Sequence, residues 1–148
     1  MLLPDTITMA IRAYTDTSYE GFTSFPANET EAAEALANAF YQYSLTITPA
    51  CVTQAAARDA MKAALSGMSA PGAAPAIISA AAASFATAIL MAGYTAAPPA
   101  APLDLSGAAA IGLAGGTAQA CAIQLGVTID AWFKTGTATN GSTTINWL

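Results

Sequence analysis

Histidine is absent from this 148-residue chain. Its absence removes the side chain that proteins most often use as a general base or a metal ligand, and it excludes a Ser-His-Asp triad and a Cys-His nucleophile. The three closest acids, Glu29, Glu31 and Glu34, stand at the start of a predicted helix. They could pair for acid–base work or bind a cation, but carboxylates at that position favour the positive end of the helix dipole. We therefore predict no enzymatic activity, no cofactor, no metal ion and no small-molecule substrate.

Charged side chains are also scarce. They make up 9% of the chain, against about 25% in a typical globular domain. Only four are basic, namely Arg12, Arg58, Lys62 and Lys134, and the net charge is −5. A protein that binds nucleic acid directly needs clustered cations that release counterions from the phosphates. The scarcity of basic residues therefore argues against direct contact with DNA or RNA.

Cysteine is limited to Cys51 and Cys121, which are too few for a metal motif or a disulfide framework. Free buried thiols fit this pattern better than a disulfide, although a fold that brought the two together would allow one. The first residues, Met1 to Asp5, show no basic region, no long apolar stretch and no cleavage site of a secretory signal. We expect the protein to be made and kept in a cytoplasm until it is assembled or released.

Alanine dominates what is present. It supplies roughly a quarter of the chain, several-fold above ordinary usage, and hydrophobic residues together reach 55%. Alanine is the best helix former but buries little area, so an alanine-rich core needs helices that approach closely, or a partner. Because few charges remain to coat a monomer, the composition favours oligomerisation or membrane insertion.

The first third of the chain predicts two helices and an aromatic loop. Residues 5–19 suggest a helix capped by Asp5, with a strand over residues 6–14 as the alternative. Residues 21–27 form a loop with Phe22 and Phe25, which would plug the end of a helical core or, if exposed, mark a partner surface. Asn28 then caps a helix that continues to about residue 44, with Glu31 at the capping-box position.

The middle of the chain predicts two further helices. Thr48 as cap and Pro49 as first helical residue begin one that ends at Gly67. Its predicted polar stripe consists of Gln54, Arg58 and Lys62, and its predicted inward face of Val52, Ala56, Ala60 and Ala63. Residues 76–92 are hydrophobic nearly all round, which is typical of a helix buried in protein or in a membrane. Gly93 is its expected C-cap.

A stiff proline linker over residues 96–102 precedes the last helix, which Asp104 or Ser106 caps and which continues to Phe133. Glycines at 112, 115 and 116 predict a kink or a break in it. The expected fold is therefore mainly α: an alanine-rich bundle of about four to five helices over residues 1–134, followed by a short β-hairpin or extended arm.

The arm over residues 135–148 changes character, because alanine gives way to threonine and glycine. Asn140-Gly141 between threonine-rich runs predicts a hairpin with these two residues as a type I′ turn. The arm could fold back on its own helices, remain loose, or contact a neighbouring molecule. For the last case, the predicted partner-binding residues are Trp132, Thr137, Thr139, Thr143, Ile145 and Trp147.

The end of the chain resembles a known class of proteins. Trp132 and Lys134 are followed by Thr135-Gly136-Thr137-Ala138-Thr139 and by Trp147 near the end. This pattern is similar to that of small alanine-rich structural proteins of tailed bacteriophages, although the segment 140–144 lacks the prolines associated with such ends. The resemblance implies a component of the virion, in the tail, neck or baseplate, and no catalytic residue is attached to the pattern.

Three functional hypotheses follow. The first is a non-enzymatic phage structural subunit, located in the virion after assembly in the bacterial cytoplasm, whose partners are other copies of itself and other virion proteins. Its arm would contact a neighbour, so removal of residues 135–148 should leave the helices folded but abolish assembly. The second is a small membrane protein of holin type, motivated by the mean hydropathy of +0.49, but weak apolar drivers and the absence of a basic loop bias argue against it. The third is a soluble helical adaptor or assembly factor.

Overall fold

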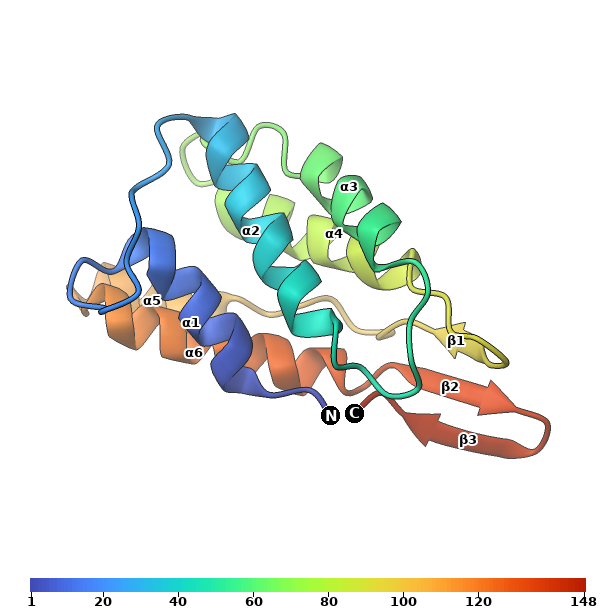
Figure 1. The fold of residues 1–148 in the computed structure, drawn as a ribbon. Coiled ribbons are helices and arrows are strands. Elements are labelled where there is room, and N and C mark those ends of the chain that lie inside the picture. The colour runs from blue at the N-terminus through green and yellow to red at the C-terminus, as the bar shows by residue number, and fades with distance from the viewer.

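The computed structural model describes all 148 residues as a helical bundle with a small antiparallel sheet (Figure 1). The predicted fold class is confirmed, and the bundle has six helices because the last predicted helix is broken in two. The helices are α1 (Pro4–Thr15), α2 (Glu29–Ser44), α3 (Gln54–Ala64), α4 (Ala74–Thr87), α5 (Ser106–Leu113) and α6 (Ala118–Phe133). The strands are β1 (Thr95–Ala97), β2 (Thr137–Asn140) and β3 (Thr143–Asn146).

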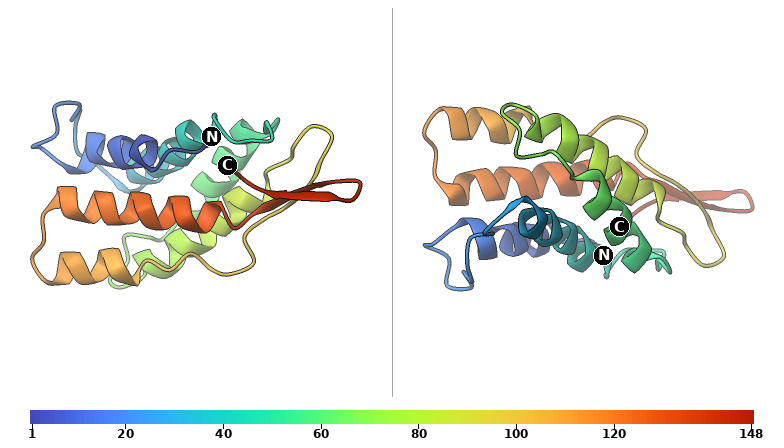
Figure 2. Two further views of the ribbon diagram at one scale, coloured as in Figure 1. Left: turned by 90° about the horizontal axis from the view of Figure 1, so that it is seen from below. Right: turned by 90° about the horizontal axis from the view of Figure 1, so that it is seen from above.

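The helices pack mainly on their neighbours in a continuous series. Helix α5 packs on α6, α6 on α1, α1 on α2, α2 on α3 and α3 on α4. Figure 2 shows the sheet projecting from one end of this bundle, whereas the α1–α2 and α5–α6 connections lie at the opposite end. The two ends of the molecule are therefore built from different kinds of secondary structure.

Helix α1 confirms the helical alternative for the first segment, but it begins at Pro4, so Asp5 lies inside its first turn and does not cap it. Proline is favoured there because its missing N–H would have no partner in a first turn. Ile7 and Ile11, four residues apart, are buried against the rest of the bundle. A Cβ at Gly126 of α6 would collide with the Thr8 hydroxyl, so glycine permits the close approach of α1 and α6.

Helix α2 begins as predicted. The Asn28 side chain accepts a hydrogen bond from the Glu31 amide at 2.9 Å. The Glu31 carboxylate accepts from the amide of Ala27, one residue before the cap. Phe40 and Tyr43 are fully buried on its inner face.

Helix α3 differs from its prediction in both start and orientation. It begins at Gln54, because the preceding segment is held against residues 88–91: the Thr53 hydroxyl donates to the Ala88 carbonyl at 2.7 Å and accepts from the Leu90 amide at 2.8 Å. The predicted inward residues Val52, Ala56, Ala60 and Ala63 are exposed, and the buried residues are Ala57, Met61 and Leu65. The predicted polar stripe instead lies beside α2, where Lys62 forms an ion pair with Glu34 at 2.8 Å and the Arg58 guanidinium lies over the Tyr41 ring.

Helix α4 ends at Thr87, six residues before the predicted cap Gly93. Gly93 has a φ of +77° and lies in the tight turn between Met91 and Tyr94, which glycine permits because it has no Cβ. The predicted break of the last helix is confirmed. Gly115, at a φ of +76°, separates α5 from α6, and the Thr117 hydroxyl caps α6 by accepting from the Ala120 amide.

The core is centred on aromatic side chains from four parts of the chain. The ring centroids of Phe40 and Phe85 are 5.6 Å apart, those of Tyr43 and Phe133 5.6 Å, and those of Phe133 and Trp147 5.0 Å. These large rings supply burial area that alanine cannot. Both cysteine thiols are free, as the sequence favoured. No helix in the structure has both the length and the apolar character needed to cross a membrane.

Candidate interaction surfaces

The predicted hairpin exists and belongs to a three-stranded antiparallel sheet of order β1-β2-β3. In this sheet Thr95, Thr139 and Thr144 lie opposite one another, and so do Ala96, Ala138 and Ile145. The first strand was not predicted, because Thr95-Ala96-Ala97 carries no strand signal of its own. It becomes a strand only by pairing with β2, about forty residues further along the chain.

The hairpin turn is shifted by one residue from its predicted position. Asn140 and Thr143 are the last paired residues, so Gly141 and Ser142 form the turn. Gly141 has a φ of +59°, and no residue other than glycine has a positive φ anywhere in the chain. A type I′ turn requires positive φ at both central residues, whereas a type II′ turn requires it only at the first, where glycine is favoured. Asn140 therefore stays in the strand.

Trp147 is fully buried within its own chain. Its indole Nε1 donates to the Thr137 carbonyl at 2.9 Å, and its ring packs on the backbone at Gly136. A Cβ at Gly136 would lie 2.5 Å from the ring, so this close stacking requires glycine. Trp132 is also covered, and its indole donates to the Ala101 carbonyl at 2.7 Å.

A polar network fixes the end of α6 beside the hairpin. The Asp130 carboxylate accepts from the Tyr43 hydroxyl at 2.7 Å and pairs with the Lys134 ammonium at 2.9 Å. Burial, followed by this hydrogen bond to a carboxylate, raises the pKa of Tyr43, so the phenol stays protonated. The Thr135 hydroxyl donates to the Trp132 carbonyl. These contacts hold the chain as it leaves α6, and they account for the motif residues Trp132, Lys134 and Thr135.

The other predicted partner-binding residues are at the surface of the sheet. Thr137 and Thr139 are half-buried on one face, and Thr143 is exposed and Ile145 half-buried on the opposite face. The hydroxyl groups of Thr139 and Thr144 form a hydrogen bond at 2.9 Å between β2 and β3. The structure thus divides the six predicted residues: the two tryptophans are used inside the chain, and the other four lie on a small threonine-rich sheet.

A surface that the sequence analysis did not single out lies on α5 and α6. Ala108 is the only buried residue of α5, and no charged residue occurs between Asp104 and Asp130. Leu113 is 91% exposed, Val127 52% and Ile123 45%. We call the exposed apolar side chains of residues 106–127 the α5–α6 surface. In the sequence, the α5–α6 surface corresponds to a charge-free stretch that is longer than the other helices of the chain can cover.

Polar clusters elsewhere are satisfied within the chain. A shallow cavity of about 490 Å³ lies between α2 and α3, lined by Glu29, Thr30, Ala33, Asp59, Lys62, Ala63 and Ser66. The Glu29 carboxylate at its rim accepts hydrogen bonds from the Ser69 hydroxyl and from the amides of Gly67 and Ser69. These bonds, that of the Ser69 hydroxyl first, hold the pKa of Glu29 below its usual range. This acid joins two parts of the fold, since it ties the start of α2 to the turn after α3.

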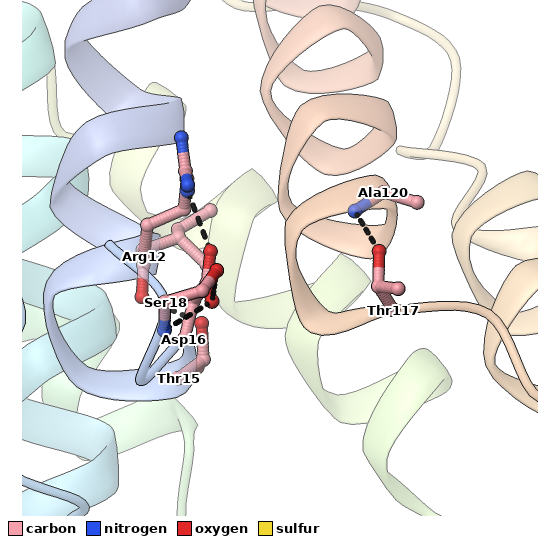
Figure 3. Close-up of polar contacts among 7 residues, drawn as sticks. Arg12, Thr15, Asp16, Ser18, Thr117 and Ala120 are labelled. Atoms are coloured by element: carbon pink, nitrogen blue, oxygen red, sulfur yellow. Dashed lines mark hydrogen bonds and ion pairs between the residues drawn. The ribbon is translucent and has the colours of Figure 1, made fainter.

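A second cluster closes the end of α1 (Figure 3). The Asp16 carboxylate accepts from the Ser18 hydroxyl at 2.6 Å and the Ser18 amide at 3.0 Å, and it pairs with the Arg12 guanidinium at 2.7 Å. These contacts, led by the Ser18 hydroxyl, lower the pKa of Asp16. No group of three or more metal-ligating side chains lies close enough together to hold an ion.

The aromatic loop between α1 and α2 does not plug the core. Phe25 is 60% exposed, and its ring contacts the edge of Phe22 at a centroid distance of 5.1 Å. Phe22 is half-buried, so the loop matches neither alternative fully: Phe25 alone is exposed.

Comparison of the chain with protein families, with curated proteins and with solved structures finds no match. The geometry of the surfaces therefore carries the functional argument.

Proposed function

We propose that this chain is a non-enzymatic structural subunit of a tailed-phage virion, a component of the tail, neck or baseplate, that associates with copies of itself through the α5–α6 surface. The observation that carries the proposal is the exposure of Leu113, Ile123 and Val127 on the charge-free stretch between Asp104 and Asp130. Large apolar side chains that stay exposed along a charge-free stretch of helix favour an interaction site.

The physical gain from covering this surface is substantial. Full burial of an exposed leucine, isoleucine or valine side chain contributes about 1.5–3 kcal/mol. Leu113 is almost fully exposed, and Ile123 and Val127 are about half exposed, so covering them in each copy offsets part of the entropy lost on association. The small alanine and glycine side chains of α5 also allow a second helix to approach closely. Both properties favour a helix-packed assembly of identical subunits.

The C-terminal pattern supports the same proposal in a different way. Its residues Trp132, Gly136 and Trp147 have structural roles, because they fasten the hairpin to the bundle. None of these roles uses a catalytic group. The resemblance to alanine-rich virion proteins therefore agrees with what the motif does in this chain.

The direct experiment is mass spectrometry of purified phage particles from a host that encodes this chain. The proposal expects the protein in the particles at a stoichiometry of several copies per virion. Its absence from particles, together with its presence in the lysate, would favour the adaptor or assembly-factor hypothesis instead. Recovery only in the detergent-extracted membrane fraction would favour the holin-type alternative.

A further inference from the structure

The outer edge of β3 is open, and the two edges of the sheet differ. Figure 1 shows no other segment running alongside the outer side of the β3 strand. Strand β1, at the other edge, has three residues and is followed at once by Pro98 and Pro99, which have no amide hydrogen and so discourage the addition of a strand. The segment 142–146 contains neither proline nor charge. Apart from its short length of four residues, the β3 edge therefore lacks the features with which proteins protect an edge strand.

The hydrogen bonds of the hairpin define which backbone groups are free. The Trp147 amide donates to the Gly136 carbonyl, which continues the register in which Asn146 lies opposite Thr137. Because bonding alternates along an antiparallel strand, the amides and carbonyls of Thr144 and Asn146 point away from β2. The next outward residue, Leu148, already exchanges two backbone hydrogen bonds with Thr48, at 2.7 and 3.1 Å. The free edge thus consists of Thr144 and Asn146.

We propose that the free edge of β3 pairs antiparallel with the same edge of a second copy, about a twofold axis at Thr144, to form a continuous six-stranded sheet. This inference rests on the proposed function, since it supplies a second contact between copies of the subunit. A twofold axis is the commonest relation between identical chains, and it makes the two contact surfaces identical. An uncharged edge meets its own copy without electrostatic repulsion, which suits it to this occupant.

The register follows from side-chain faces and from Thr48. Residues opposite one another in an antiparallel sheet share a face, so Thr144 must oppose either Thr144 or Asn146 of the second copy, or the turn residue Ser142. With Asn146 as partner, Ser142 of the second copy would take the place that Thr48 already occupies beside Leu148. With Ser142 as partner, Asn146 would remain unpaired. When Thr144 opposes Thr144 of the second copy, Thr48 keeps its place beside Leu148 and Asn146 is paired. We therefore choose this register.

The proposed pairing brings specific residues opposite one another on each face of the six-stranded sheet. The opposed residues Thr95, Thr139 and Thr144 would meet their equivalents and form an unbroken row of threonines across six strands. Threonine is favoured at such positions because its branched side chain fits the pleated surface and its hydroxyl bonds across strands. On the other face, Thr143 would oppose Ile145 of the second copy.

The pairing is weak by itself. Edges of four residues bury far less than the roughly 800 Å² per partner of a stable interface, so the contact acts together with the α5–α6 surface. A covalent trap is therefore the suitable test. Thr143 and Ile145 oppose each other at a pair without backbone hydrogen bonds, where side chains are closest and within reach of a disulfide.

The experiment uses variants of the full chain in which Cys121→Ser leaves the introduced cysteine as the only accessible thiol, since Cys51 is buried. Thr143→Cys and Ile145→Cys are oxidised separately and as an equimolar mixture, after helicity has been checked. The mixed disulfide should form at least about tenfold faster than either homodimer. Thr95→Cys, in the same threonine row but at the blocked edge, is the control.

Two results would overturn the inference. A fastest reaction of Ile145→Cys with itself would refute the register, and rates no higher than that of Thr95→Cys would refute the pairing. An added Thr144→Lys substitution should slow the mixed reaction about tenfold by placing charges opposite each other, whereas Thr95→Lys should not. Detection of the protein in virions is independent of these rates, so failure of the edge pairing and failure of the proposed function are distinguishable.

Discussion

Two hairpins of this chain, one of strands and one of helices, use their apolar side chains in opposite ways. The β2–β3 hairpin stands out in the sequence as an arm, yet its Trp147 is fully buried in the chain's own core. The α5–α6 pair belongs to the ordinary alanine-rich part, yet it leaves Leu113 91% exposed. The comparison shows that a change of composition marks a different secondary structure, whereas the proposed interaction surface consists of apolar residues that the fold leaves uncovered.

This contrast corrects the expected effect of removing residues 135–148. The sequence alone suggested that the helices would remain folded, because the arm looked separable. Trp147 contacts Phe133 at a ring distance of 5.0 Å, and Leu148 pairs with Thr48, so the arm is part of the folded bundle. Truncation would therefore lower the stability of the bundle and cannot serve as a clean test of assembly.

The largest effect is expected from Trp147→Ala. Removal of a fully buried aromatic side chain should lower the free energy of unfolding by about 3–5 kcal/mol, measured by urea denaturation. Phe25→Ala is the matched control, because Phe25 is 60% exposed, and it should change stability by less than about 0.5 kcal/mol. Similar losses in the two variants would contradict the docking of the arm.

The next effect concerns association rather than stability. The double variant Leu113→Asp/Ile123→Asp places two charges on the α5–α6 surface. Each of the two substitutions should weaken self-association by at least about tenfold. Size-exclusion chromatography with light scattering would measure this, and the urea midpoint should stay nearly constant. The control variant Ala56→Asp/Ala60→Asp carries the same charges on the exposed side of α3 and should associate normally. Equal behaviour of the two double variants would contradict the assignment of the surface.

Two glycine-to-alanine substitutions, one in each hairpin, test how tightly the two hairpins are packed. Gly136→Ala would drive a Cβ into the Trp147 ring and should cost about 1–3 kcal/mol of stability. Gly112→Ala meets nothing closer than the Cys121 sulfur at 4.0 Å, so it should be neutral or stabilise α5 by up to about 1 kcal/mol. Thermal unfolding of both variants would measure the difference. A reversed order would mean that the strand hairpin is loose and the helical hairpin tightly packed.

The smallest expected effect is a loss of stability at acidic pH. The folded-state pKa values of Asp16 and Asp104 are lowered from 3.8, each chiefly by a serine hydroxyl, that of Ser18 or Ser106. A carboxyl group with a lowered pKa contributes stability that is fully present above its unfolded value and is lost as the pH falls through its folded value. Unfolding measured between pH 5 and 2 should therefore show a decline beginning near pH 4. Asp16→Asn should flatten it, and an unchanged slope would show that this carboxylate contributes nothing.

The parts of the fold that could be predicted from the sequence depend on interactions between residues close together in the chain. Asn28 caps α2 through a residue three positions away, and the break before α6 follows from Gly115 and the Thr117 cap. The parts that it missed depend on distant contacts. Strand β1 exists through its pairing with β2, and α3 starts late because Thr53 is bound by Ala88 and Leu90.

The candidate surfaces divide in the same way. That Thr137, Thr139, Thr143 and Ile145 lie on a sheet followed from local β propensity, and the structure agrees. The burial of Trp132 and Trp147 could not be predicted, since Trp147 packs on the backbone at Gly136 and Trp132 donates to the distant Ala101 carbonyl. The α5–α6 surface was missed because a charge-free alanine-rich segment is equally consistent with a buried helix until the packing of the other helices is known.

Sedimentation velocity of the unmodified chain over a range of concentrations tests the central claim most directly. If copies of the chain cover the α5–α6 surface of one another, the weight-average mass should rise with concentration well above the 14.8 kDa of one chain. A constant mass of one chain up to millimolar concentration would contradict the claim that this surface joins identical subunits.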